Sequence, residues 1–492
     1  MYLEKSCVLR CDDGVIKSEE QDVQQSIEQL GGLDTTFVYC ETPTMHLHVC
    51  GLMVLDTSTM AEGYSFERIR SMLSERLPAV AAVRQHLVHA PLHISRPFWI
   101  DDGHLDIDQH LHRVTARPPG DDRSLSELVG DIASWPLPRD RPLWEMWVVE
   151  GLSGSRVALV TKMHHSTIDG VSGANMLGRL FDLEPIHEFT AGPETRQPRL
   201  PPHSWELLAH GAASRLAEPW DIVQLIPSTI YRLGSTFWQL RRHREDATGA
   251  AAPFTAPRTM FNATITARRS VAFTNVSLAD VKTVKNATGT TVNDVVTAVA
   301  GGALRRYLES CGDLPDHTLL AAAPVSVHDQ TKDHIGTTRL SVMFSSLATD
   351  EKDPLERLRT VASSNRQAKK INKMVGADTL VRWSEHFWFN GFGLGARFYS
   401  ALHVADHHPV VHNLILSNVP GPPIPLYLAG ARLVGLYPLG PITDGAGLNV
   451  TVLSQEERIG FGFVTCPDLV PDVWEMADAV PEALAELVDA VS

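Results

Sequence analysis

The chain has 492 residues, which is more than one hydrophobic core usually holds and favours two domains. Hydrophobic residues make up 43% and charged residues 21%, a balance that excludes collagen-like and broadly disordered proteins. The formal net charge of −15 disfavours binding to the nucleic-acid backbone, so no nucleic-acid partner is expected. No apolar run reaches the roughly 18 residues of a membrane span, and the N-terminus lacks the apolar region of a secretory signal. We therefore expect a cytoplasmic protein.

The first half of the chain alternates between predicted strands and helices. Residues 1–30 are polar, acidic and weakly periodic, and they indicate an extension that is disordered or an over-long start. From residue 31 the pattern is regular, and we interpret 31–184 as an N-terminal domain. Apolar spacing predicts a strand over 46–55, helices over 65–77 and 124–134, a hairpin with strands over 144–150 and 156–163, and a helix from 173.

Prolines punctuate residues 185–262 between amphipathic helical stretches, so this segment is predicted to be a crossover linker. Residues 263–492 then resume the alternation and form the predicted C-terminal domain. The expected elements are strands over 269–273, 410–416, 449–454 and 459–465, and helices over 278–288, 291–308 and from 471.

The sharpest local feature is His164-His165-Ser166-Thr167-Ile168-Asp169-Gly170, which follows a predicted strand. Imidazole suits proton transfer near neutral pH, and a loop at a strand end presents such a group well. Asp169 stands four residues after His165 and could hold the loop, while Gly170 permits a turn. The residues alone leave three alternatives open: a metal site, a structural histidine pair, and a Ser166 nucleophile with His165 as its base.

Several segments together carry a family resemblance. The His164–Gly170 run resembles the HHxxxDG motif of CoA-dependent acyltransferases. Five further matches follow the order seen in the bacterial wax ester synthase/diacylglycerol acyltransferase family. They are Leu33-Asp34 with Glu41-Thr42-Pro43 and Met45-His46-Leu47-His48, Arg141-Pro142-Leu143-Trp144, Thr291-Val292-Asn293-Asp294, Pro324-Val325-Ser326-Val327, and Leu416-Ser417-Asn418-Val419-Pro420-Gly421-Pro422. The chain is therefore identified as similar to this family from about residue 31 to its C-terminus.

The resemblance implies an α/β fold of two domains like chloramphenicol acetyltransferase, each with a mixed sheet flanked by helices, and a tunnel between them. It implies transfer of a long-chain acyl group from acyl-CoA to diacylglycerol, giving triacylglycerol, or to a long-chain alcohol, giving a wax ester. Acyl-CoA would be a co-substrate, and neither a cofactor nor a metal is expected.

The resemblance also implies roles for individual residues. His165 would be the general base beside His164, and Asp169 would hold the loop. Asn293 would donate a hydrogen bond to the developing oxyanion, although capping of its helix is the open alternative. Five further motif residues are expected to bind substrate: Gly170, Trp144, Asp294, Ser417 and Asn418. For Trp144, packing in the core is the alternative.

Two apolar segments bear on how substrate arrives. The crossover carries aromatic residues and a basic end, Arg241-Arg242-His243-Arg244, which fits either the inner membrane face or a lipid inclusion, or else packing between domains. The cluster Trp383, Phe387, Trp388, Phe389 and Phe392 could line an acyl channel or form core. Two rival functions remain: a condensing enzyme that takes its acyl group from a carrier protein, and a non-catalytic lipid-binding relative.

Overall fold

The computed structural model describes residues 27–89, 91, 95–101, 105–167, 176, 178–185, 252–326, 340–375 and 389–492. Most of the predicted crossover lies outside these residues, as do Asp169 and Gly170. Of the predicted aromatic cluster, the same holds for Trp383, Phe387 and Trp388.

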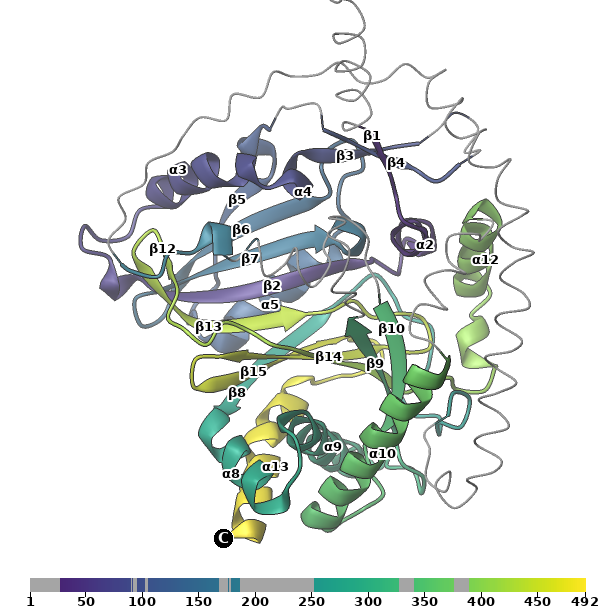
Figure 1. The fold of residues 1–492 in the computed structure, drawn as a ribbon. Helices are drawn as coiled ribbons and strands as arrows, with labels where there is room; N and C mark the ends of the chain where they lie inside the picture. The colour runs from purple at the N-terminus through teal and green to yellow at the C-terminus, as the bar shows by residue number, and fades with distance from the viewer. Residues whose placement is uncertain are drawn as a thin grey trace, which may run out of the picture.

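A six-stranded mixed sheet forms the N-terminal half of the molecule (Figure 1). Its strand order is β12-β13-β2-β7-β6-β5, in which β5 and β6 run parallel and the other neighbours run antiparallel. The strands are β2 (His48–Asp56), β5 (Leu111–Thr115), β6 (Trp144–Leu152), β7 (Arg156–His164), β12 (Tyr427–Leu428) and β13 (Ala431–Leu439). Because β12 and β13 come late in the chain, both halves of the sequence contribute to this sheet.

Side-chain alternation gives this sheet two buried faces. On β7, Leu159 and Met163 lie in the core covered by α3 (Phe66–Arg76). Val160 lies in the opposite core, covered by α5 (Asp122–Ser134). Shorter elements complete this region: η1 (Thr57–Thr59), η2 (Leu77–Ala79), α4 (Ala81–Arg84) and η4 (Ile107–Gln109).

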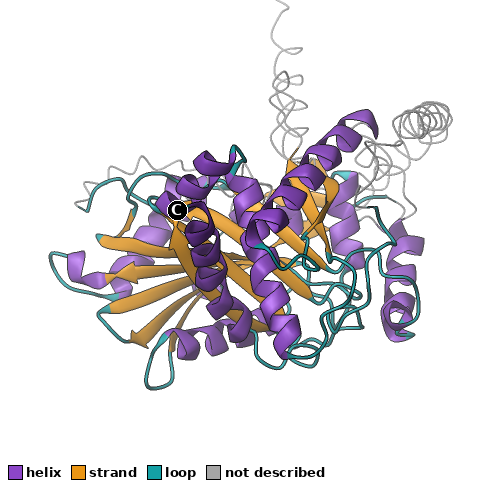
Figure 2. Cartoon of the chain, turned by 90° about the horizontal axis from the view of Figure 1, so that it is seen from below, coloured by secondary structure: helices purple, strands orange, loops and turns teal. Residues whose placement is uncertain are grey.

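The second six-stranded mixed sheet has the order β10-β9-β11-β14-β15-β8. Its strands are β8 (Ser270–Ser277), β9 (Leu320–Ser326), β10 (Leu340–Ser346), β11 (Leu414–Val419), β14 (Leu448–Gln455) and β15 (Arg458–Thr465). The helices α8 (Leu278–Thr288), α9 (Val292–Ser310), α10 (Pro354–Val375) and α13 (Trp474–Val491) form a layer against this sheet (Figure 2). Central β11 runs parallel to both β9 and β14, so the carboxyl ends of β9 and β11 meet at one edge.

A smaller unit lies beside the N-terminal sheet. Three strands, β1 (Ile27–Gln29), β4 (Phe98–Asp101) and β3 (Gln85–Val88), form an antiparallel sheet, so the last residues of the predicted extension are part of a strand. Nearby, α2 (Gly32–Cys40) packs against α12 (Phe389–Ala401), and η6 (Val404–Asp406) follows α12 (Figure 1). The contact is close because Gly393 has no Cβ, which would stand 3.0 Å from the Tyr39 carbonyl oxygen.

The predicted α/β class, with two mixed sheets flanked by helices, is confirmed. Several element boundaries differ from their predicted positions; β8, for example, extends to Ser277 instead of ending at residue 273. Side-chain hydrogen bonds explain two of the differences. β11 begins four residues later than predicted, because the side chain of Asn413 bonds the backbone of Leu320 and Pro257 instead of continuing a strand. α13 begins at Trp474, because the Asp472 carboxylate accepts the hydrogen bond of the Trp474 backbone N–H.

Candidate active site

The two histidines of the motif lie at the end of β7, where the strand passes into η5 (His165–Thr167). His164 is the last strand residue and pairs with His48 on β2, and its backbone N–H donates to the Leu143 carbonyl. The backbone N–H of His165 donates to the Leu47 carbonyl at 2.8 Å. The sheet therefore fixes the backbone of both histidines before the chain leaves it.

The imidazole of His164 is fully buried and held by its own turn. The Ser166 backbone N–H donates to Nδ1 at 3.2 Å, and the Ser166 hydroxyl lies 2.7 Å from the same atom. Because Nδ1 accepts a hydrogen bond, the proton of the neutral ring lies on Nε2, which faces Glu41 Oε2 at 3.9 Å. Glu41 also forms an ion pair with Arg139. Burial, and then the nearby Arg139 cation, hold the pKa of His164 well below its usual value.

The imidazole of His165 is less constrained. Its ring lies against the Phe37 ring of α2, with 4.2 Å between centroids and 32° between planes. Its Nδ1 is buried and makes no hydrogen bond within the described part of the chain. Burial lowers the pKa of His165, so the ring is neutral near pH 7 and can accept a proton. The arrangement can therefore supply a proton acceptor at this position.

A second pair of buried histidines stands at the start of β2. The rings of His46 and His48 stack with 5.6 Å between centroids. Nε2 of His48 donates to the Ala133 carbonyl at 2.9 Å, whereas neither ring nitrogen of His46 has a hydrogen-bond partner among the described residues. Burial, and then the charge of Arg269, lower the pKa of His46 to about 4. These residues line a small pocket and belong to a matched motif, but the sequence assigned them no role.

A buried ion pair lies on the same strand, just before the motif in the sequence. Lys162 on β7 stands opposite Glu145 on β6, and its Nζ lies 2.8 Å from Glu145 Oε2. The ammonium also donates to the Ile132 and Trp135 carbonyls. The side chain of Lys162 is completely buried, so all three of its donors are used inside the protein. The sequence offered no sign of this pair, because strand alternation alone does not identify a buried lysine.

Trp144 lies in the hydrophobic core, 1% exposed. Its indole N–H donates to the Val83 carbonyl at 2.8 Å, and its ring stacks on His110 with 4.3 Å between centroids. These contacts agree with the core-packing alternative for Trp144, although the assignment to substrate binding stays a prediction.

The Asn293 and Asn418 motifs meet although they are far apart in the sequence. Asn293 lies in the first turn of α9, and Asn418 lies near the carboxyl end of β11. The Asn418 amide donates to Asn293 Oδ1 at 3.1 Å, which directs the Asn293 NH₂ group away from this bond. Ser417, the neighbouring motif residue, is half-buried on β11 and pairs with Thr451.

Asp294 uses its carboxylate within the fold. Oδ2 accepts from the backbone N–H and hydroxyl of Thr291, and the Thr291 hydroxyl caps the Asp294 backbone N–H, completing a capping box. Oδ1 accepts from the Asn365 amide of α10 at 2.7 Å. Asp294 therefore ties the start of α9 to α10 and leaves Asn293, which is half-buried, as the more accessible member of the motif pair.

The described residues place His164 and His165 together and Asn293 and Asn418 together. Within those residues, no hydrogen bond, ion pair or ring contact joins the first pair to the second. Asp169 and Gly170 lie outside them, and their assignments stay predictions. In the described ranges, no three His, Cys, Asp or Glu side chains are placed to hold one metal ion, and no helix is long and apolar enough to span a bilayer.

Two residues that contact the site had no sequence signal of their own. Phe37 stacks on His165 from α2, and Asn365 reaches Asp294 from α10. Glu41, beside His164, belongs to a matched motif but had no predicted role of its own. A contact between two distant segments produces no periodic pattern in the sequence. Alignment with relatives would therefore have been needed to find Phe37 and Asn365.

Comparison with known proteins identifies the family. Residues 30–296 match the wax ester synthase/diacylglycerol acyltransferase catalytic domain, and residues 337–488 match the C-terminal domain of the same family. A Mycobacterium tuberculosis H37Rv protein assigned as a diacylglycerol O-acyltransferase is 41% identical over 465 residues, covering 94% of this chain and 91% of the relative. A Mycobacterium bovis protein with the same assignment is 33% identical over 470 residues, covering 93% and 98%.

Solved structures agree with this result. The wax ester synthase/diacylglycerol acyltransferase of Marinobacter aquaeolei VT8 superposes with a TM-score of 0.66 at 28% identity, covering 94% of this chain and 99% of that one. The starter condensation domain of rhizomide synthetase superposes with a TM-score of 0.53 at 10% identity, covering 96% of each chain, and shares the fold. The two-domain fold expected from the resemblance is thus confirmed.

Proposed function

We propose that this chain, an acyltransferase that belongs to the wax ester synthase/diacylglycerol acyltransferase family, moves a long-chain acyl group from acyl-CoA to the free hydroxyl of diacylglycerol. The product would be triacylglycerol. A long-chain alcohol is the second acceptor that the family name suggests, and its product would be a wax ester.

The contrast between the two motif histidines carries this proposal. His164 is fully buried, bonded to Ser166 and faced by Glu41, so its ring is committed to the fold. His165 also has a lowered pKa, but among the described residues its ring stacks on Phe37 and its buried Nδ1 makes no hydrogen bond. A neutral, positioned imidazole of this kind suits a general base, which contributes roughly 10²- to 10⁴-fold to a rate.

In the proposed reaction, His165 takes the proton of the acceptor hydroxyl as that oxygen attacks the carbonyl carbon of the thioester. The resulting tetrahedral intermediate carries an oxyanion. When it collapses, the carbon–sulfur bond breaks and the imidazolium returns its proton to the departing CoA thiolate. No acyl-enzyme forms, so donor and acceptor must be bound together.

Asn293 is the proposed donor to the oxyanion. Its Oδ1 accepts from Asn418, so its NH₂ group is directed elsewhere and donates to no other residue in the described part of the chain. Asn418 would position this amide, and its own amide would not contact the reacting atoms. Hydrogen bonds prepared before the reaction stabilise an oxyanion without a cost of reorientation.

The experiment is an acceptor screen with a labelled long-chain acyl-CoA. We expect CoA release and labelled triacylglycerol with diacylglycerol, and loss of both with His165→Ala. Turnover only when the acyl group is presented on a carrier protein would support the condensing rival. Binding of lipid without CoA release for any acceptor would support the non-catalytic rival.

Contact with a lipid surface is a further part of the proposal, because diacylglycerol resides in membranes and lipid inclusions. Leu394, Phe398 and Leu402 recur at four-residue spacing along α12 and just beyond it, and all three are exposed. We expect the protein to sediment with diacylglycerol-containing vesicles and Phe398→Ser to weaken this binding. Leu183→Ser, at an exposed leucine elsewhere, is the matched control. Equal binding by both variants would exclude α12 as the contact.

A further inference from the structure

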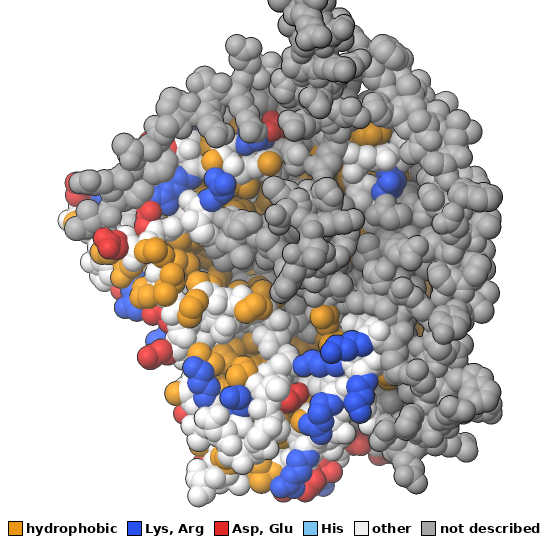
Figure 3. Space-filling view, in the orientation of Figure 1, with side chains coloured by type: hydrophobic (Ala, Val, Ile, Leu, Met, Phe, Trp, Pro, Cys, Tyr) orange, Lys and Arg blue, Asp and Glu red, His pale blue; other side chains and the backbone are white. Residues whose placement is uncertain are grey.

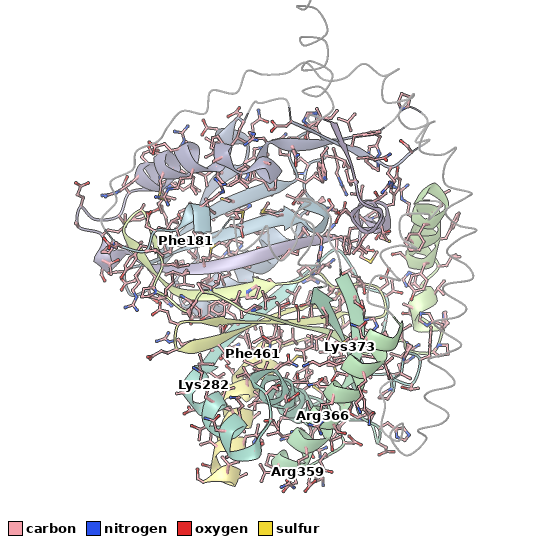
Figure 4. The ribbon with its side chains drawn as sticks, viewed as in Figure 1. Phe181, Lys282, Arg359, Arg366, Lys373 and Phe461 are labelled. Carbon is pink, nitrogen blue, oxygen red and sulfur yellow. The ribbon has the colours of Figure 1, made fainter. Side chains whose placement is uncertain are left out.

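One face of α10 carries a concentration of positive charge. Arg366, Lys369, Lys370 and Lys373 are exposed and stand at helical positions i, i+3, i+4 and i+7, so they share that face. We call these four residues the basic face. Lysine and arginine side chains gather over this helix in Figure 3, and Figure 4 labels Arg366 and Lys373 at the two ends of the basic face.

The basic face is not explained by the stability of its helix. Within the described residues, no ion pair joins any of the four cations to a carboxylate, whereas Arg359 on the same helix pairs with Glu356. Like charges at i, i+3 and i, i+4 destabilise a helix, and the helix dipole favours cations only in the last turn. The whole chain carries a net charge of −15, so the basic face is opposite in sign to the net charge of the protein.

Hydrogen bonds tie the basic face to the proposed site. Ser341 and Ser345 of β10 donate to Asn372 and Asn365 of α10, at 2.6 Å and 2.5 Å. Asn365, which precedes Arg366, donates in turn to Asp294, the residue after Asn293. The basic face is therefore joined through one side chain to the turn that carries the proposed oxyanion donor.

The edge of the sheet beneath the basic face is a favourable place for a ligand. The start of β10, where Ser341 bonds Asn372, pairs with the end of β9. The carboxyl ends of β9 and β11 lie at this same edge, and Asn418 stands there. In open α/β sheets, ligands bind outside the carboxyl ends of strands.

From these observations we propose that the basic face binds the phosphate groups of the acyl-CoA donor. The inference rests on the proposed function, which puts the thioester at the site. CoA carries a 3′-phosphate and a diphosphate at the far end of its pantetheine arm, so a thioester held near Asn293 places an anionic group within reach of α10. Lysine and arginine bind phosphate through charge-assisted hydrogen bonds, and a local cationic patch attracts an anionic substrate to an acidic protein.

The test compares two sets of charge-removing substitutions in the full chain. The test variant is R366Q/K369Q/K370Q/K373Q, and K369Q/K373Q is a milder second version. The control is K282Q/K285Q on α8, which removes the exposed Lys282, labelled in Figure 4, and the half-buried Lys285 from another helix. Three quantities are measured: the Kd of CoA and of dephospho-CoA without turnover, the KM of acyl-CoA, and the KM of the N-acetylcysteamine thioester of the same acyl group, which lacks phosphate.

We expect the test variant to bind CoA about tenfold or more weakly than wild type, with a similar rise in the KM of acyl-CoA. Its turnover of the N-acetylcysteamine thioester should be unchanged, which also shows that it folds. Added salt should weaken CoA binding by wild type more than by the variant. K369Q/K373Q should show a smaller loss in the same direction, and K282Q/K285Q should match wild type.

Equal CoA affinity in wild type and the test variant would overturn the proposal. Loss of binding to anionic phospholipid vesicles with unchanged CoA affinity would also overturn it, because the phosphate would then belong to a lipid headgroup. A wild-type protein that binds CoA through the basic face, but releases none during incubation with acyl-CoA and any acceptor, would refute the proposed function alone.

Discussion

The Ser166 hydroxyl lies 2.7 Å from Nδ1 of His164, so the serine of the motif contacts the first histidine. Nδ1 of His165 has no hydrogen-bond partner among the described residues, and its ring lies against Phe37. Two adjacent histidines therefore have different surroundings, because one ends the strand and the other begins the turn. This difference makes their proposed roles separable by mutation.

His165→Ala is expected to lower kcat by roughly 10²-fold or more while the protein stays folded, because a general base is lost. His164→Ala should instead lower the melting temperature, because it removes a buried ring that Ser166 and the sheet hold. Steady-state kinetics and thermal unfolding of the two variants check this. Equal losses of kcat at unchanged melting temperature would contradict the division of roles.

Asn293→Ala is expected to lower kcat by roughly 10²-fold with little change in KM, because an oxyanion donor acts mainly in the transition state. Asn418→Ala should lower kcat less, because it releases the orientation of Asn293 without removing the donor. Asn286→Ala, at an exposed asparagine on α8, is the control. A rise in KM with unchanged kcat would instead assign Asn293 to substrate binding.

Much of the fold could be predicted, because periodicity is a local signal. The hairpin that presents His165 and the helix that begins at Val292 both occur where apolar spacing placed them. The return of β13 to the N-terminal sheet could not be predicted, since its pairing with β2 depends on contacts more than 370 residues apart, such as Arg432 with Asp56.

The sequence indicated candidate residues for the site but not the contacts between them. The motif order indicated His164, His165, Asn293 and Asn418 together, but spacing could not show which histidine is bound by Ser166. The pairing of Asn418 with Asn293 joins a motif on β11 to one at the start of α9, and no local pattern encodes such a bond. The sequence also gives no sign that a charged residue such as Lys162 is buried.

Glu145→Gln is expected to destabilise the protein by about 3–5 kcal/mol, because it leaves the Lys162 ammonium buried without its counter-charge. The double variant Glu145→Gln/Lys162→Met should recover much of that loss. Asp108→Asn, which breaks the exposed pair with Arg70, should cost far less and serves as the control. Urea unfolding measures all three. A cost for Glu145→Gln no greater than that of Asp108→Asn would contradict the buried pair's importance.

His46 is expected to make stability fall as the pH falls. Its pKa is about 4 in the folded protein, against the ordinary histidine value of 6.5, so the unfolded chain binds the proton first. The contribution of neutral His46 to the free energy of unfolding is fully present above about pH 6.5. As the pH falls from there to about pH 4, this contribution decreases by about 1.4 kcal/mol per pH unit. His48 and His164, whose pKa values burial also lowers, add to the same slope.

His46→Phe keeps a ring to stack on His48 and removes the titration. Its unfolding free energy should therefore depend less steeply on pH across that range than that of wild type. His407→Gln, at an exposed histidine, is the control. Urea unfolding at a series of pH values measures the slopes, and identical slopes for His46→Phe and wild type would refute a buried, neutral His46.

Direct transfer predicts that acyl-CoA alone leaves no covalent mark on the protein. The contact between Ser166 and His164 is the one arrangement in the described site that resembles a nucleophile with its base, so it is the alternative to exclude. Nδ1 of His164 also accepts the Ser166 backbone N–H, and the serine is 6% exposed, which fits a structural turn better than attack on a substrate.

Intact-protein mass spectrometry after incubation with acyl-CoA should therefore show an unchanged mass, and initial-rate plots should intersect because both substrates bind before transfer. Ser166→Ala should retain most of the wild-type kcat, with any loss shared by His164→Ala because the two side chains support one another. An acyl mass increment would overturn the mechanism if Ser166→Ala abolishes it and added alcohol converts it into product. In that case His164 would be the base, His165→Ala would still form the adduct, and the roles of the two histidines would be exchanged.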